Sequence, residues 1–220
     1  MKLPASLFAL SLLAACNVNT RDADNNSKGN EFTTKDAALA AVIQTLPQVL
    51  SSNQKRLYNL TDADLKSVTP GKEVAVRDIT FDEVMKAPEG DLATLLTRDS
   101  SSALVPLAVN NATRLFVEMR NEGNTWRIQS VGNRKFLNAL KDPAAAQNSE
   151  VVSVHGLAID LVKRTDASGI VYVPTETNKQ AGFVKDTPYT GAVALQNLKA
   201  YASVLSRQFG DKLKTGEIDD

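Results

Sequence analysis

Residues 103–131 read ALVPLAVNNATRLFVEMRNEGNTWRIQSV and carry the clearest strand signals in the chain. Polar turn residues at 110–111 and 121–124 divide this stretch into three apolar segments. In the middle segment, 113–120, apolar side chains alternate with charged ones, and Phe116 falls among the charged positions. Because alternate residues of a strand face opposite sides of a sheet, we predict an antiparallel meander with one buried face.

Helical signals precede this meander. Residues 33–36 supply threonine caps and an acid for the first turn. Apolar residues then recur at three- and four-residue spacing as far as Leu46, and Pro47 is expected to kink or end the helix. The same reasoning predicts a helix near 57–60, a helix capped by Thr61, a strand at 73–79, a helical turn at 81–86 and a helix at 134–141.

A second strand pair is predicted at 151–162 and 170–173, with a turn at 166–169. Residues 174–188, which follow it, are irregular and polar. A loop of this length is uncommon unless it binds something or is mobile.

The strongest helical pattern lies near the C-terminus. Its apolar residues are spaced alternately by three and four positions, and Gly210 is a suitable stop. These residues are Leu195, Leu198, Ala202, Leu205 and Phe209. Such a helix either packs on the sheet of its own domain or presents this face to a partner.

Together these elements predict an α+β fold, in which antiparallel β meanders pack with an N-terminal helical segment and a C-terminal helix. The length of 220 residues and the apolar content of 43% suit one globular domain or two small ones. We assign this domain to residues 33–220, with a candidate subdomain boundary in the connector near 142–150.

Near the start of the sequence, the cation Lys2 precedes an apolar stretch at 3–13, which is followed by small residues. About a dozen apolar residues are too few to cross a bilayer, which needs ~20 in a helix. A cation, a short apolar stretch and small residues are typical of a cleaved secretory signal. Residues 1–15 are therefore predicted to be a signal peptide and not part of the fold.

The four residues Leu13-Ala14-Ala15-Cys16 resemble the lipobox of bacterial lipoproteins. The resemblance implies cleavage before Cys16 and a diacylglyceryl group on its sulfur, so that lipid holds the protein to a membrane. Cys16 is the only cysteine in the chain, and lipidation would account for a lone thiol in a secreted protein. The alternatives are an ordinary secretory signal and a cytosolic protein with an apolar start.

Residues 16–32 are predicted to form the lipidated cysteine and a flexible tether. The segment 17–30 holds five asparagines and only one sizeable apolar residue, Val18, so it cannot bury enough surface to order itself. Asn17 occupies the position where, in the enterobacterial sorting rule, aspartate retains a lipoprotein in the inner membrane. By that analogy the predicted location is the cell envelope, with the outer membrane favoured over the inner membrane.

The charges of the chain are balanced, with 25 Lys and Arg against 25 Asp and Glu. Loss of Lys2 with the signal peptide would leave 24 cations (25 minus Lys2) against 25 anions. Neither a basic patch nor a polyanionic tail is indicated, so nucleic acid is not an expected partner.

Few residues are available for catalysis. His155 is the only histidine, and it lies in a predicted strand near Ser153 and Asp160. A Ser-His-Asp triad is defined by geometry, and no G-x-S-x-G nucleophile turn is present. Zinc would need about three His, Cys or carboxylate ligands, and no phosphate-cradling glycine loop occurs. The sequence therefore predicts no catalytic residue, no metal site and no cofactor.

Four aromatic residues are candidates for a ligand or partner surface: Phe116, Trp126, Tyr172 and Tyr189. Trp126 with Phe116 would line a ligand site if both side chains reached the same surface. The alternative is that they belong to the core, where a lone tryptophan of a meander is more often found.

The expected function is that of a membrane-anchored envelope lipoprotein whose domain acts as a non-catalytic interaction or scaffold domain for another envelope protein. One alternative is a binding lipoprotein for a small or lipidic ligand, which would need a concave apolar pocket. The least favoured alternative is a hydrolytic enzyme, in which acids would meet Ser153 or His155 in a cleft.

Overall fold

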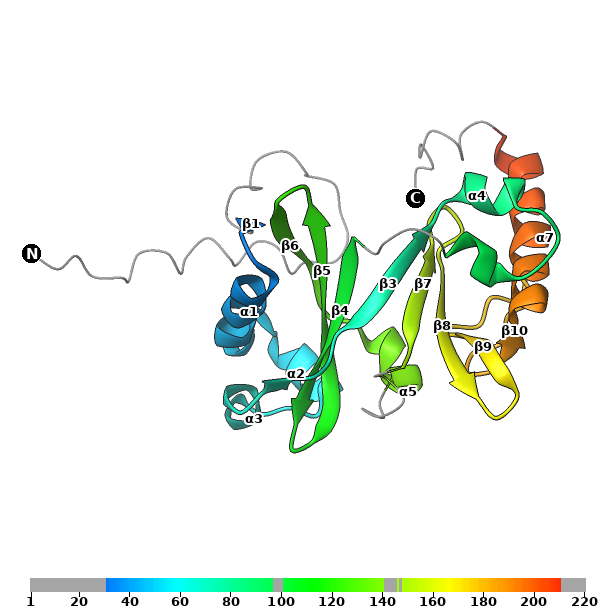
Figure 1. Ribbon diagram of the computed structural model, residues 1–220. Helices are drawn as coiled ribbons and strands as arrows, with labels where there is room; N and C mark the ends of the chain where they lie inside the picture. The colour runs from blue at the N-terminus through cyan, green and yellow to red at the C-terminus, as the bar shows by residue number, and fades with distance from the viewer. Residues whose placement is uncertain (1–30, 97–100, 141–145, 147, 211–220) are drawn as a thin grey trace, which may run out of the picture.

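The strands of this protein form one continuous sheet with helices at both ends (Figure 1). The computed structural model describes residues 31–96, 101–140, 146 and 148–210. Its strands are β1 (Glu31–Phe32), β2 (Thr69–Pro70), β3 (Val74–Ile79), β4 (Ser102–Val109), β5 (Ala112–Glu122), β6 (Thr125–Gly132), β7 (Glu150–Val154), β8 (Ile159–Asp166), β9 (Gly169–Pro174) and β10 (Tyr189–Thr190). The strand order is β1-β6-β5-β4-β3-β7-β8-β9-β10, and β2 pairs with β4 outside this path.

The helices are α1 (Lys35–Val49), α2 (Ser52–Tyr58), α3 (Asp62–Lys66), α4 (Phe81–Lys86), α5 (Leu137–Leu140) and α7 (Gly191–Phe209), with the 3-10 turns η3 (Leu92–Leu95) and η4 (Arg134–Phe136). Helices α1 to α4 and α7 each begin after a serine or threonine whose side chain accepts a backbone N–H, as N-caps do. Thr34 and Thr61 are two of these caps, as the sequence predicts.

The predicted α+β fold is confirmed, and so are the meander of β4, β5 and β6 and the C-terminal helix that ends at Gly210. One pairing departs from the antiparallel pattern, because β3 and β7 run parallel from Ala75 beside Glu150 to Ile79 beside Val154. Most of the candidate boundary near 142–150 lies outside the described residues. Strands from both sides of it nevertheless share one sheet through this parallel pair.

Three apolar clusters cover the two faces of the sheet. The first core lies under α1 to α3, against β4, β5 and β6, and includes Leu46, Leu65, Leu107, Leu115, Val117 and Met119. The second core lies at the other end of the same face, under α4, η3 and α7, and includes Ile79, Phe81, Val152, Leu161, Tyr172, Leu195 and Leu198. The middle core lies on the opposite face, under α5, and includes Val76, Leu104, Phe116, Phe136, Leu140, Val151 and Val162.

The middle core corrects the prediction of a meander with one buried face. The odd-numbered apolar residues of β5 enter the first core as predicted, but Phe116 points the other way and is also fully buried. Its ring meets that of Phe136 edge-on, with centroids 6.2 Å apart. The 3-10 turn η4 and helix α5 therefore cover the second face, which strand periodicity alone did not reveal.

Two local predictions also need correction. The alternative that Pro47 ends its helix is wrong by two residues, because α1 continues to Val49 and the proline lies in its last turn. The alternative that it kinks the helix stays a prediction. The predicted strand 151–162 is two strands, since β7 ends at Val154 and β8 begins at Ile159. The turn between them uses left-handed backbone at Gly156 (φ 83°) and Ala158 (φ 51°), and alanine gives no turn signal in the sequence.

An ion-pair network lies beside the parallel pair. Glu150 of β7 contacts Arg77 Nη2 at 3.3 Å and Lys163 Nζ at 2.8 Å, and all three side chains are about three-quarters buried. Burial raises the pKa of Glu150, but the hydrogen bonds and charges of Lys163 and Arg77 outweigh it and hold the pKa below its ordinary value of 4.5. The network therefore links β3, β7 and β8 through one carboxylate.

We predict that Glu150→Gln lowers the free energy of unfolding at pH 7 by about 1–2 kcal/mol, because two cations lose a partly buried partner. The folded-state pKa is depressed, so this stabilisation is present above about pH 4.5 and is lost as the pH falls through the folded-state value. Urea unfolding at pH 7 and pH 3 should show the difference between wild type and variant shrinking at pH 3. The exposed Glu89→Gln should change stability by less than about 0.5 kcal/mol, and a pH-independent gap for Glu150→Gln would contradict the assignment.

Candidate functional site

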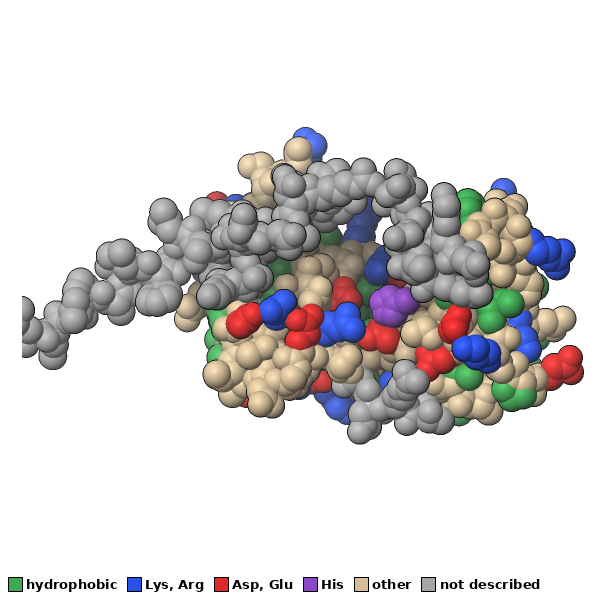
Figure 2. Space-filling model, turned by 90° about the horizontal axis from the view of Figure 1, so that it is seen from above, with side chains coloured by type: hydrophobic (Ala, Val, Ile, Leu, Met, Phe, Trp, Pro, Cys, Tyr) green, Lys and Arg blue, Asp and Glu red, His purple; other side chains and the backbone are tan. Residues whose placement is uncertain are grey.

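Polar side chains border the middle core where no described helix covers this face of the sheet. Strand register sets Arg127 beside Arg120, and it sets Asp78, Ser153 and Asp160 side by side on β3, β7 and β8. We define the polar border as Glu31, Asp78, Arg120, Glu122, Arg127, Ser153, His155 and Asp160. Figure 2 shows acidic and basic side chains following one another across this side of the molecule, with the single histidine among them.

The N-terminal half of the polar border holds two arginines at one register position. Arg127 forms ion pairs with Glu31 and with Glu122, the latter at 3.0 Å. Arg120 lies directly opposite Arg127 and is exposed. Among the described residues, no ion pair is formed by Arg120. This half therefore presents one exposed guanidinium that has no direct ion-pair partner among the described residues.

The C-terminal half of the polar border contains the residues that the sequence offered for catalysis. His155 Nε2 lies 2.9 Å from Asp78 Oδ1, and 56% of the His155 side chain is exposed. Asp160, the acid considered for a triad, instead forms an ion pair with Lys135 at 2.5 Å. Within the described part of the chain, Ser153 Oγ makes no hydrogen bond to His155.

This arrangement brings an acid and a histidine together without completing a triad. A triad needs the histidine hydrogen-bonded to the nucleophile on one side and to the acid on the other. Here Ser153 lies in β7, whereas His155 is the first residue of the turn after that strand, and no hydrogen bond joins their side chains within the described residues. The histidine is also open to water. We assign no catalytic role to these residues.

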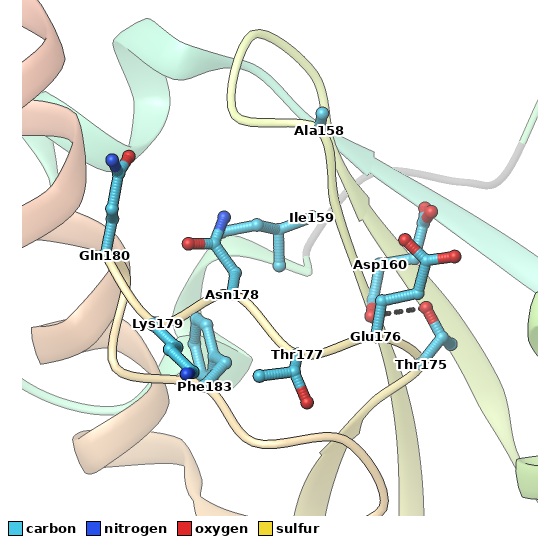
Figure 3. Close-up of a pocket in the computed structure, with 10 residues that line it drawn as sticks. All are labelled: Ala158, Ile159, Asp160, Thr175, Glu176, Thr177, Asn178, Lys179, Gln180 and Phe183. Atoms are coloured by element: carbon cyan, nitrogen blue, oxygen red, sulfur yellow. Dashed lines mark hydrogen bonds between the residues drawn. The ribbon is translucent and has the colours of Figure 1, made fainter.

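A cavity of about 250 Å³ lies at one end of the polar border, between β8 and the loop at 174–188. Its walls are formed by Ala158, Ile159, Asp160, Thr175, Glu176, Thr177, Asn178, Lys179, Gln180 and Phe183. Figure 3 shows the carboxylates of Asp160 and Glu176 on one side of this space and the amides of Asn178 and Gln180 on the other. The long irregular loop noted in the sequence thus lines a concave site.

The loop at 174–188 is held by its own hydrogen bonds. Asn178 and Phe183 exchange backbone hydrogen bonds at 3.0 and 2.9 Å, and the Asn178 side-chain oxygen accepts from Ala181 N. The Tyr189 hydroxyl accepts from Val184 N at 2.9 Å and donates to Gly182 O at 3.2 Å. These bonds close the loop over the fully buried Phe183 ring. The wall of the cavity that the loop forms is therefore held in place by the protein itself, without a ligand.

The four aromatic candidates do not form one surface. Phe116 lies in the middle core and Tyr172 in the second core, each with no exposed area. Trp126 packs against the first core, where Lys35 Nζ lies 5.6 Å from the ring centroid. Tyr189 packs against the second core, where its ring meets Phe183 edge-on. Phe116 and Tyr172 are thus packing residues, because each lies under helices on its own face.

Cys16 lies outside the described residues. Among the residues that are described, no helix is both long and apolar enough to cross a membrane. Residues 31–96, 101–140, 146 and 148–210 contain no group of three or more His, Cys, Asp or Glu side chains placed to hold a metal ion.

No protein-family model, no curated protein and no solved structure matches this chain. Its function must therefore be inferred from its own residues.

Several contacts of these sites could not be predicted from the sequence. The like-charged pair Arg120 and Arg127 depends on strand register, and the contact of Asp78 with His155 depends on the parallel pairing of β3 and β7. Neither relation has a signal in a single sequence. In the sequence, only the length and polarity of segment 174–188 indicated the cavity.

The two candidate tyrosines allow a matched test of the packing described above. Within the described residues the Tyr172 hydroxyl is buried without a hydrogen-bond partner, and burial, then the charges of Asp91 and Glu150, raise the pKa of Tyr172 far above its ordinary value. We predict that Tyr172→Phe leaves the free energy of unfolding unchanged or raises it by about 1 kcal/mol, because an unsatisfied polar group is removed. Tyr189→Phe should lower it by about 1–2 kcal/mol, because two hydrogen bonds are lost.

Urea unfolding of both variants at neutral pH measures this difference. A marked loss of stability in Tyr172→Phe would show that its hydroxyl has a partner, such as a buried water, and would contradict the prediction.

Proposed function

We propose that this chain is a lipid-anchored protein of the bacterial envelope, and that its folded domain binds another envelope protein through the polar border. The resemblance of residues 13–16 to a lipobox supports the anchor. Two acyl chains on one cysteine suffice for stable membrane attachment. A polar tether at 17–30 would let the domain reach a partner at some distance from the membrane.

The position of Arg120 is the observation that carries the partner-binding proposal. Like charges directly opposite each other on neighbouring strands are destabilising, yet Arg120 faces Arg127 in register. The two acids that contact Arg127 compensate that residue, and Arg120 remains exposed. Arginine is also enriched at protein interfaces. An exposed arginine that faces a second arginine and has no ion-pair partner among the described residues is best explained by a carboxylate that a partner supplies.

The chemistry of the polar border defines the partner. Its N-terminal half combines Glu31 and Glu122 with two arginines, so the four charges sum to zero. Recognition would therefore depend on individual charge pairs more than on attraction at long range. The proposed partner surface places an acidic side chain opposite Arg120 and polar groups opposite the Glu31–Arg127–Glu122 pairs.

The anchor is tested by lipid labelling. In cells fed a clickable fatty acid, the wild type should take up label and Cys16→Ser should not, because the acceptor sulfur is gone. Asn17→Asp is the matched control: it should keep the label and, under the enterobacterial rule, move the protein to the inner membrane. Equal labelling of wild type and Cys16→Ser would end the anchor proposal.

The partner-binding surface is tested by Arg120 variants. We predict that Arg120→Gln raises the free energy of unfolding by about 0.5 kcal/mol, because the repulsion with Arg127 is relieved. The same variant should weaken partner capture in cells, measured with a photo-crosslinking residue placed at exposed Gln129. The variant would thus be more stable than the wild type and would capture less partner. A purely structural role of Arg120 would not produce this combination.

Arg207→Gln is the matched control, since it makes the same chemical change at an exposed position of α7. It should leave capture by the Gln129 probe unchanged. If Arg120→Gln and Arg207→Gln crosslink the same proteins to the same extent as wild type, the polar border is not the binding surface.

A further inference from the structure

The cavity at the end of the polar border carries an inference that goes beyond partner binding. Its volume of about 250 Å³ falls below the range of roughly 300–1,000 Å³ that is usual for drug-sized ligands. One small ring fits this space better than an extended chain. Its walls come from β8 and from a loop whose shape is fixed by hydrogen bonds of its own.

The charges around the cavity cancel. Asp160 is already paired with Lys135, at 2.5 Å. Glu176 and Lys179, the other charged residues of the lining, are opposite in sign. An ammonium ligand would find Asp160 occupied, and an anionic ligand would face two carboxylates. The electrostatics therefore favour a neutral ligand.

The lining of the cavity contains both hydrogen-bond donors and acceptors, and several of them have no partner among the described residues. Asn178 accepts from Ala181 N through its oxygen, which leaves its amide N–H groups to donate. Thr177 Oγ1 accepts from Lys185 N, so its own hydroxyl proton is available. The side chains of Glu176 and Gln180 form no hydrogen bond with any described residue. A ligand must therefore offer both donors and acceptors in several directions.

We infer that this cavity binds a neutral polyhydroxylated ring, such as a single sugar residue. Hydroxyl groups both donate and accept hydrogen bonds, so they match carboxylate acceptors on one side of the cavity and amide donors on the other (Figure 3). Ile159 and Phe183 also line this space, but both side chains are buried, so recognition depends on the polar groups of the lining. Water competes for every one of these hydrogen bonds, so the affinity is in the millimolar range.

Saturation-transfer NMR on the full chain, purified in an amine-oxide detergent that has no sugar head group, tests this inference. Glucose, N-acetylglucosamine and inositol are the probes. Ethanolamine, citrate and hexanol are the cationic, anionic and apolar comparators. At up to about 20 mM, which reveals millimolar dissociation constants, at least one neutral polyol should receive saturation and the three comparators should not.

Variants then locate the site. Gln180→Ala and Glu176→Gln change exposed side chains that hold no part of the fold together, and each should weaken binding about three- to tenfold. Asn178→Asp keeps the oxygen that accepts from Ala181 N and removes the donors, so it should weaken binding to a similar extent without unfolding the loop. Glu89→Ala is the matched control, because it removes an exposed carboxylate from a different cavity beside the start of α7 and should leave binding unchanged.

Three results would overturn the inference. The first is no saturation of any neutral polyol. The second is preferential binding of ethanolamine, citrate or hexanol. The third is polyol binding that resists the Glu176, Asn178 and Gln180 variants or that is lost in Glu89→Ala. None of these results depends on whether Cys16 carries lipid or Arg120 meets a partner.

Discussion

The parallel pairing of β3 with β7 is the constraint on which the rest of the structure depends. Parallel neighbours need a long crossover connection, and here the crossover contains α4, η3, the meander of β4 to β6 and α5. Ala75 and Glu150, which start the pairing, are far apart in the sequence, so loop-closure entropy opposes their contact. Once it forms, it fuses two antiparallel meanders into one sheet. The carboxylate of Glu150 reinforces the junction through Arg77 and Lys163.

This junction also decides where the molecule is covered and where it is open. In the part of the chain that the structure describes, helices bury one face of the sheet at its two ends, and α5 buries the other face in the middle. Side chains that alternate along each strand must therefore be apolar on both faces near β3, β4 and β7, and can be polar beyond α5. The polar border occupies the region that no described helix covers, and the cavity lies where β8 meets the loop at 174–188. Both candidate sites follow from the incomplete cover.

Local elements could be predicted from the sequence because their signals are local. Thr34 and Thr61 mark helix starts through their side chains, and the alternation along 113–120 marks a strand. The predictions failed where they required information that no short stretch of sequence contains. In the sequence Phe116 is an apolar residue on the side of the strand that carries charged residues. Its burial is explained by α5, which packs over it. Likewise the pairs Arg120 with Arg127 and Asp78 with His155 exist only once register and strand order are known.

The charge pattern of the two candidate sites suits a domain that would work near a membrane surface. Both the polar border around Arg127 and the cavity beside Asp160 balance positive groups against negative ones, so neither would draw ligands from a distance. Binding at such sites depends on short-range hydrogen bonds and charge pairs, which are weak when water competes. A tether would compensate for this weakness, because confinement raises the effective concentration of a partner without any added contact. Weak, geometrically selective recognition and attachment through Cys16 would therefore support each other, since the attachment would supply the proximity that the sites themselves do not provide.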